Sequence, residues 1–92
     1  MAGSFDWDDA KAATNLRKHR VSFEESQTVF GDERSLTIYD EAHSETEDRY
    51  IILGMSIRAR LLVLVFTENA ENIRIISARR ATKKEANQYG DL

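Results

Sequence analysis

Residues 61–66 limit the possible folds more than any other part of the chain. All six are apolar, β-branched side chains recur among them, and the apolar residues occupy both alternating faces of an extended chain. A strand of this kind is typically covered on both faces in the middle of a sheet. We therefore expect residues 61–66 to form a central strand, whose register stays open because both faces are apolar.

Two helices are predicted ahead of the sheet. Asp6 is a suitable N-cap for a helix over residues 7–19, because a carboxylate accepts hydrogen bonds from the free N–H groups of a first turn. Ser22 and Glu25 have the spacing of a capping box, which predicts a second, short helix that ends at Gly31.

The remaining sequence predicts a four-stranded antiparallel meander and a closing helix. The connections are short and contain no proline, so each strand can pair with the one before it. Thr82 and Glu85 again have capping-box spacing, which predicts a helix that begins at Thr82 and ends near Tyr89. The strands are expected over residues 35–39, 49–55, 61–66 and 73–76.

The predicted fold class is α+β, with two N-terminal helices, the four-stranded antiparallel meander and a C-terminal helix in a single domain over residues 1–92. Within it, we expect residues 1–4 to be a flexible start or an expression remnant. The helices are expected mainly on one face of the sheet. The other face would be partly covered, with Arg60 and Arg74 projecting from it.

The composition is that of a folded protein, with 41% hydrophobic and 9% aromatic residues. No apolar stretch reaches membrane-spanning length and no signal peptide is apparent, so we expect a cytoplasmic location without membrane contact. Cysteine is absent and only His19 and His43 supply imidazole. Thiolate metal sites are excluded, and we expect neither a metal nor another cofactor.

The net charge of −3 hides an asymmetry along the chain. Residues 1–57 contain 6 Lys+Arg and 12 Asp+Glu, whereas residues 58–84 contain 7 and 2. Such a basic segment indicates a focused anion-binding surface. Lys83 and Lys84 fit this surface, because they lie in a helical first turn whose free N–H groups attract phosphate although its dipole disfavours cations. The alternative is that both are solvated surface charges.

Segments along nearly the whole chain resemble the BrnT toxins. The resemblance is carried, in chain order, by Phe5-Asp6-Trp7-Asp8, Lys18-His19-x-Val21-Ser22-Phe23-Glu24-Glu25, Asp48-Arg49-Tyr50, Arg60-Leu61-Leu62-Val63, Ile73-Arg74-Ile75-Ile76-Ser77-Ala78-Arg79 and Thr82-Lys83-Lys84-Glu85. One departure is Ala59, where the family commonly has Gly. It leaves the direction of the neighbouring Arg58 and Arg60 open.

The resemblance implies a RelE-like fold and a bacterial type II toxin that degrades RNA and so inhibits translation and growth. It implies a BrnA-type antitoxin with a ribbon-helix-helix region as the neutralising partner. Operator DNA would be bound only through the toxin–antitoxin complex, and a homodimer within that complex is left open.

Metal-independent cleavage of RNA by 2′-OH attack needs proton-transfer groups and cations that stabilise the phosphate. Arginine forks match phosphate oxygens, and histidine suits proton transfer near neutral pH. The catalytic candidates are Arg74, Arg79, Arg60 and His19, and the RNA-binding candidates are Arg58, Arg80, Lys83 and Lys84. We expect the arginines and the start of the last helix to converge on one pocket.

Two other interpretations compete with this site. Arg74 could cover apolar surface with its stem, and His19 could simply complement the dipole at the end of its helix. At the level of function, the rival is a non-catalytic module whose basic face binds an acidic protein or holds nucleic acid without cutting it. Cleavage of RNA in the presence of EDTA separates an enzyme from such a module.

Overall fold

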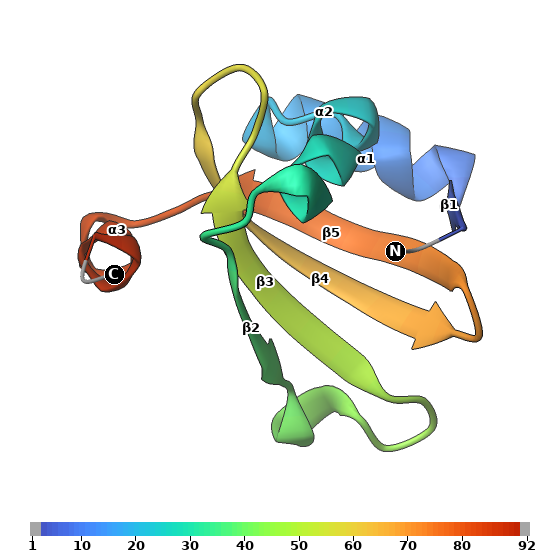
Figure 1. Ribbon diagram of the computed structural model, residues 1–92. Helices are drawn as coiled ribbons and strands as arrows, with labels where there is room; N and C mark the ends of the chain where they lie inside the picture. Colours follow the sequence, from blue (N-terminus) through green and yellow to red (C-terminus); the bar gives the residue numbers. More distant parts are fainter. Residues whose placement is uncertain (1–2, 91–92) are drawn as a thin grey trace.

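The computed structural model describes residues 3–90, which form one five-stranded sheet and three α-helices (Figure 1). The strand order across the sheet is β1-β5-β4-β3-β2. In chain order the elements are β1 Ser4–Asp6, α1 Asp9–His19, α2 Phe23–Gln27, the 3₁₀ turn η1 Thr28–Gly31, β2 Leu36–Tyr39, the 3₁₀ turn η2 Glu41–His43, β3 Arg49–Met55, β4 Leu61–Asn69, β5 Asn72–Arg80 and α3 Lys83–Tyr89.

The α+β class is confirmed, but the prediction of a purely antiparallel four-stranded sheet is wrong. Strands β2 to β5 form the expected meander, and β1 adds a fifth strand parallel to β5, with Ser4 opposite Asn72. Gly3 N also donates to Glu71 O at 2.8 Å. Ser4 is therefore not part of a flexible start, while residues 1–2 lie outside the described residues. A three-residue strand is too short to show an alternating pattern.

Strand β4 is the central strand, as its apolar run predicts. It pairs with β3 on one side and β5 on the other, and Leu62 and Leu64 are fully buried beneath the helices. Val63, on the opposite face, is also buried. A β-bulge between Val65 and Phe66 shifts the register against β5, as bulges do in antiparallel pairs.

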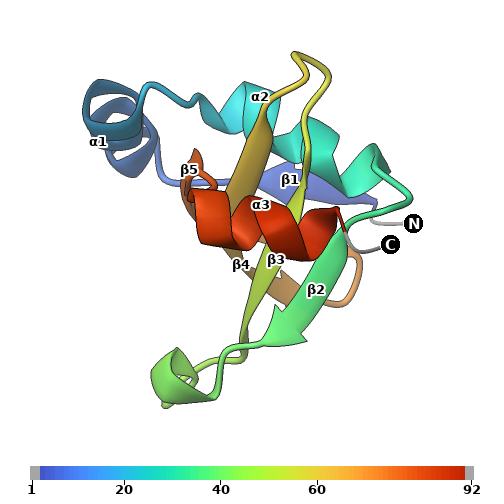
Figure 2. The ribbon, with the colours of Figure 1, turned by 90° about the vertical axis from the view of Figure 1, so that its left-hand side faces the viewer.

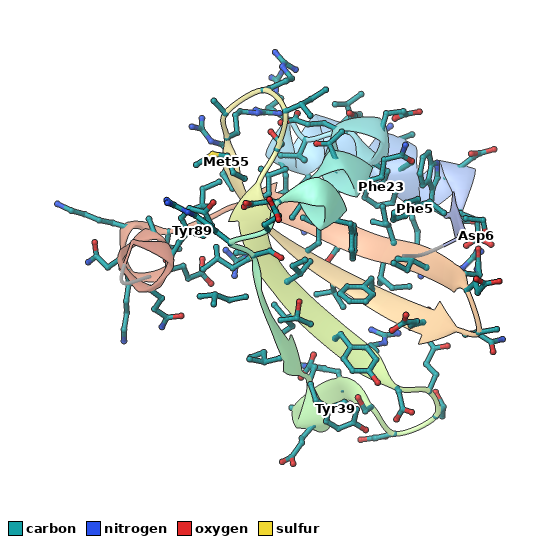
Figure 3. All side chains as sticks on the ribbon, in the orientation of Figure 1. Phe5, Asp6, Phe23, Tyr39, Met55 and Tyr89 are labelled. Carbon is teal, nitrogen blue, oxygen red and sulfur yellow. The ribbon has the colours of Figure 1, made fainter. Side chains whose placement is uncertain are left out.

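The hydrophobic core lies between the sheet and the layer formed by α1, α2 and η1 (Figure 1). Figure 3 shows Phe5 and Phe23 between these helices and the sheet. Trp7 meets Phe23 edge to face at 5.9 Å, so both aromatic residues pack in or against the core, as expected. The buried core residues are Val21, Phe23, Val29, Ile52, Leu62, Leu64, Phe66, Ile73, Ile75 and Ala78.

Helix α1 begins later than predicted. Its N-cap is Asp8, whose carboxylate accepts from Lys11 N at 2.9 Å, whereas Asp6 is extended in β1. The helix ends at His19, as predicted, and its C-cap Arg20 is in the left-handed region with φ 60°. The second helix is also shorter than predicted, because the chain tightens into η1 after Gln27.

One buried side chain attaches α1 to the sheet. Asn15 Nδ2 donates to Ala78 O at 2.8 Å, and Ala78 N donates to Asn15 Oδ1 at 3.1 Å. The same Nδ2 donates to Val21 O at 3.0 Å. The amide therefore takes the place of a neighbouring strand on β5, which β1 pairs only over residues 72–74. This contact fixes the position of α1 along β5.

Helix α3 crosses the face of the sheet opposite α1 and α2 (Figure 2). Its predicted capping box is present, with Thr82 and Glu85 satisfying each other's backbone N–H groups. No residue of α3 is buried, so this helix is held mainly by polar contacts. Tyr89, labelled in Figure 3, donates its hydroxyl to Asp32 Oδ2 at 2.7 Å.

Candidate functional site

Arg60 belongs to a buried polar network at the β3–β4 hairpin. Its guanidinium donates to both carboxylate oxygens of Glu25 and, at 3.1 Å, to Arg20 O. Ser56 Oγ donates to Glu25 Oε2 at 2.7 Å. The hydrogen bonds from Arg60 hold the pKa of the buried Glu25 carboxylate below its usual value. Arg60 therefore joins the hairpin to α2. The prediction that it projects from the open face of the sheet is wrong.

The hairpin shows why glycine suits position 59. Ala59 has φ 60°, a left-handed conformation that glycine adopts without strain but that is strained for a residue with a Cβ. The turn still closes normally, with Ala59 N donating to Ser56 O at 2.9 Å and Ser56 N donating to Arg60 O at 2.9 Å. Arg58, at the tip, is 70% exposed and lies 3.8 Å from Glu25.

Arg74 does project from the open face, but it lies at the β1 end of β5. Its guanidinium donates to Asp6 Oδ1 at 3.1 Å, and both side chains are about half exposed. The groove around it is lined by Asn72, by Glu47 and Asp48 of the β2–β3 connection, and by Thr67, Glu68 and Asn69 at the end of β4. Arg74 is thus separated along β5 from Arg79 by five residues, roughly 16 Å of extended strand.

Arg79 lies at the other end of β5 and is paired with α3. Its Nη1 and Nη2 donate to the two carboxylate oxygens of Glu85, each at 2.8 Å. This fork lowers the pKa of Glu85 from 4.5 to about 2. Glu85 Oε1 also accepts from Thr82 N at 2.8 Å, so one carboxylate both caps α3 and attaches it to β5.

The prediction that the arginines converge on one pocket is wrong. Arg60, Arg74 and Arg79 each pair with a different carboxylate, supplied by α2, β1 and α3 respectively. Arg74 and Arg79 line different grooves, and Arg60 lies in the network at the hairpin. These pairings join residues far apart in sequence, apart from Arg79 with Glu85, and no local pattern reveals them.

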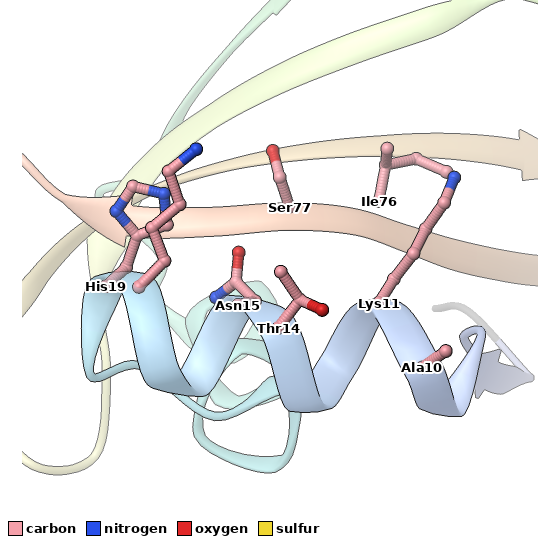
Figure 4. A pocket seen from close by; sticks show the side chains of 8 residues that line it. Ala10, Lys11, Thr14, Asn15, His19, Ile76 and Ser77 are labelled. Atoms are coloured by element: carbon pink, nitrogen blue, oxygen red, sulfur yellow. The ribbon is translucent and has the colours of Figure 1, made fainter.

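A basic groove lies between α1 and β5 (Figure 4). This α1–β5 groove has a volume of about 340 Å³ and is lined by Ala10, Lys11, Thr14, Asn15, Lys18, His19, Ile76 and Ser77. Lys11, Lys18 and His19 fall on one stripe of the helix because they are separated by seven and eight residues. That spacing is a signal by which the two lysines could have been found from sequence.

A second groove lies between α3 and the open face of the sheet. This α3–sheet groove has a volume of about 240 Å³ and is lined by Leu36, Ile38, Ile51, Leu53, Val63, Val65, Ser77, Arg79, Glu85 and Gln88. Ser77 lines both grooves, so they meet at this position of β5. The structure therefore brings His19 and Arg79 to adjoining surfaces on either side of Ser77.

The remaining cationic candidates divide between two places. Arg80, Lys83 and Lys84 are exposed around the end of β5 and the start of α3. Figure 2 shows α1 and the start of α3 on the same side of the molecule. Arg58 instead lines a groove beside α2. The Tyr89 hydroxyl lies away from Lys83 and Lys84, at the other end of α3, where it donates a hydrogen bond to Asp32.

Two features, a metal-binding cluster and a membrane-spanning helix, are absent from the described residues. Among residues 3–90, no group of three or more His, Asp or Glu side chains is placed to hold a metal ion. In the same part of the chain, no helix has both the length and the apolar character needed to cross a membrane.

Comparison with known proteins identifies the family to which the chain belongs. No curated protein matches the chain. Among solved structures, the ribonuclease toxin BrnT of Brucella abortus matches with a TM-score of 0.69 and 22% identity, over 87% of this chain and 97% of that chain. A family described as "Ribonuclease toxin, BrnT, of type II toxin-antitoxin system" matches residues 7–85. This match covers most of the chain, including α1, the meander and the start of α3, and so the chain belongs to the BrnT family of ribonuclease toxins of type II toxin–antitoxin systems.

Proposed function

We propose that this toxin cleaves RNA without a metal ion, at the surface where the α1–β5 groove and the α3–sheet groove meet. One observation carries the proposal: Ser77 lines both grooves, with His19 on one side and Arg79 on the other. A histidine and an arginine beside one strand position supply a proton-transfer group and a phosphate-binding fork.

The proposed reaction is attack of a ribose 2′-OH on the adjacent phosphorus. His19 removes the 2′-OH proton as the new O–P bond forms, and the bond from phosphorus to the 5′-oxygen breaks. The products are a 2′,3′-cyclic phosphate and a 5′-OH end, with the leaving oxygen taking a proton from solvent or a protonated side chain. Arg79 stabilises the charge on the pentavalent phosphate.

The lysines around this surface would hold neighbouring phosphates. Lys11 and Lys18 line the same groove as His19, and Lys83 and Lys84 are exposed at the N-terminus of α3. Arg80 is exposed next to them at the end of β5. Cations that track a backbone bind single-stranded RNA without reading its sequence. Four of the seven basic residues in the segment 58–84, namely Arg79, Arg80, Lys83 and Lys84, belong to this surface.

Arg79 has to exchange partners for this chemistry to occur. Both of its terminal nitrogens bond Glu85 here, so an RNA phosphate must displace that carboxylate or bind beside it. The pair is 42% and 28% exposed, and an ion pair open to water contributes only about 0–1 kcal/mol. Exchange is therefore within reach of ordinary binding energies.

The partner we propose is a BrnA-type antitoxin with a ribbon-helix-helix region. It would neutralise the toxin, and the complex would bind operator DNA through the antitoxin. The proposal is supported by membership of a family of type II toxins. RNA and antitoxin would both be met in the bacterial cytoplasm, where the toxin would inhibit translation and growth.

Purified protein incubated with RNA in excess EDTA tests the nuclease and its site. We expect cyclic-phosphate products from the unsubstituted protein, and a loss of at least about 100-fold in cleavage rate for His19→Ala and Arg79→Ala, the usual cost of removing such groups. His43→Ala is the matched control, because this second histidine is exposed and bonded to Asp40.

Arg74→Ala decides between the two ends of β5. Arg74 and Arg79 are both catalytic candidates from the sequence, and our proposal uses Arg79 because it lines a groove that adjoins the one with His19. If only Arg74→Ala abolishes cleavage, the site lies at the β1 end and our assignment is wrong. If RNA stays intact but shifts on a gel, the protein is a binding module.

A further inference from the structure

The α3–sheet groove is more apolar than an RNA site requires. Apart from Ser77 and Arg79, the strands contribute only aliphatic side chains to it. Ile38 on β2 is 61% exposed, although isoleucine is normally among the most buried residues. RNA phosphates gain nothing from such a surface, and removing them from water there would cost free energy. The groove is better suited to a protein.

The uncovered part of this face lies toward the end of β2 that leads into residues 40–48. Helix α3 has no buried residue of its own and crosses the other end of the face, from the end of β5 to the start of β2, where Tyr89 donates to Asp32 at 2.7 Å. Strand β2 pairs only with β3, so it forms a free edge of the sheet. Figure 2 shows α3 in front of the sheet and β2 running on below it at the sheet edge. A partner can therefore reach Ile38 and its neighbours without moving a core element.

The charges at the two ends of the groove have opposite signs. At the β2 end, residues 40–48 contain five acidic residues against His43, and Asp40 directly follows β2. At the other end lie Arg79 and the lysines at the start of α3. Complementary charges fix the orientation of a partner and speed its association.

We infer that this groove is where the antitoxin docks, through a segment with a row of aliphatic side chains, a basic end over residues 40–48 and a carboxylate directed at Arg79. The existence of an antitoxin follows from the family. Docking would also block RNA, because this groove shares Ser77 with the α1–β5 groove. This second consequence rests on the proposed function. The partner would neutralise the toxin by covering Arg79 and one side of that shared position.

Substitution at Ile38 tests the interface. The probe is the purified product of the reading frame adjacent to the toxin gene, with affinity measured by titration calorimetry. We expect Ile38→Asp to weaken binding by about 30-fold or more, since a central aliphatic contact is replaced by a carboxylate that must lose water against the partner's aliphatic row. Ile57→Asp is the matched control, because Ile57 is 81% exposed at the hairpin tip, outside the groove.

The outcomes separate the possible occupants. Circular dichroism first establishes that both variants are folded. Unchanged antitoxin affinity in folded Ile38→Asp overturns the inference, as does equal weakening by Ile57→Asp. If Ile38→Asp instead abolishes self-association in light scattering, or RNA binding, while antitoxin binding persists, a second copy or RNA occupies the groove. Selective loss of antitoxin binding supports the interface even if no variant cleaves RNA, so the two proposals can fail separately.

Discussion

At the scale of single residues, Arg60 shows how a cation predicted to be catalytic can be structural. Its guanidinium is the main partner of Glu25, whose side chain is only 4% exposed. Removing one member of a buried pair leaves the other charge without compensation, which typically costs 3–5 kcal/mol. The same substitution in a phosphate-binding arginine would leave the fold intact.

We therefore predict that Arg60→Ala lowers the free energy of unfolding by about 3 kcal/mol. Urea denaturation at neutral pH measures the change. Arg58→Ala is the control, because Arg58 is 70% exposed and lies 3.8 Å from the same carboxylate, and it should cost less than about 0.5 kcal/mol. A stable Arg60→Ala protein that has lost cleavage would instead return Arg60 to the active site.

At the scale of elements, α3 depends on Glu85 more than on packing. In the folded protein the pKa of Glu85 is about 2, lowered from 4.5 mainly by Arg79. A carboxylate with a lowered pKa stabilises the protein above its unfolded pKa, and this contribution is lost as the pH falls through the folded pKa. The relevant window thus runs from about pH 4.5 down to about pH 2.

We predict that the stability difference between the unsubstituted protein and Glu85→Gln is nearly constant above pH 5 and shrinks toward zero between pH 4.5 and 2. Because Arg79 is 42% exposed, the difference at neutral pH should be no more than about 1 kcal/mol. Chemical denaturation across this pH range gives the profile. Glu45→Gln, which changes an exposed acid in the β2–β3 connection, is the matched control.

The elements also show which parts of the fold the sequence could predict. Local signals worked: the apolar run predicted the central strand β4, and Ser22 and Thr82 cap the starts of α2 and α3 as their spacing predicted. Thr82 and Glu85 form the expected capping box, whereas at α2 the Glu25 carboxylate bonds Arg60 and Ser56 instead of the N-cap backbone. Strand β1 escaped because three residues carry no period, and its partner β5 lies almost seventy residues away. The seven-residue spacing of Lys11 and Lys18 places both lysines on one side of α1, and it is visible in the sequence alone.

The site was harder to predict than the fold for a physical reason. Arginine types and positions are visible in sequence, but the carboxylate that each one meets depends on tertiary packing. Arg74 meets Asp6 across β1 and β5, and Arg60 meets Glu25 across the α2–hairpin contact. His19 and Arg79 line adjoining grooves because Asn15 fixes α1 along β5. Such relations follow from the assembled sheet.

At the scale of the whole molecule, charge is divided between two regions. Residues 40–48, five of which are acidic, lie at the end of the molecule away from α1 (Figure 1). The two elements that carry the lysines, α1 and the start of α3, lie on one side of the molecule (Figure 2). An acidic protein with a local basic surface attracts a polyanion in one orientation and repels it in others. RNA should thus approach from the side of α1.

This division makes the salt dependence of RNA binding a test of the path that RNA takes. Each phosphate contact to a single strand contributes about 0.7 to the slope of log K against log salt. We predict that Lys11→Ala with Lys18→Ala lowers the slope by about 1.4, because both lysines line one groove. Fluorescence anisotropy with a labelled single-stranded RNA gives the slope, using the Arg79→Ala background to prevent cleavage.

Arg34→Ala is the matched control, because Arg34 is an exposed cation outside both grooves, and this substitution should leave the slope unchanged. An unchanged slope in the double variant would place RNA elsewhere on the surface, because two lost phosphate contacts cannot be silent in this measurement.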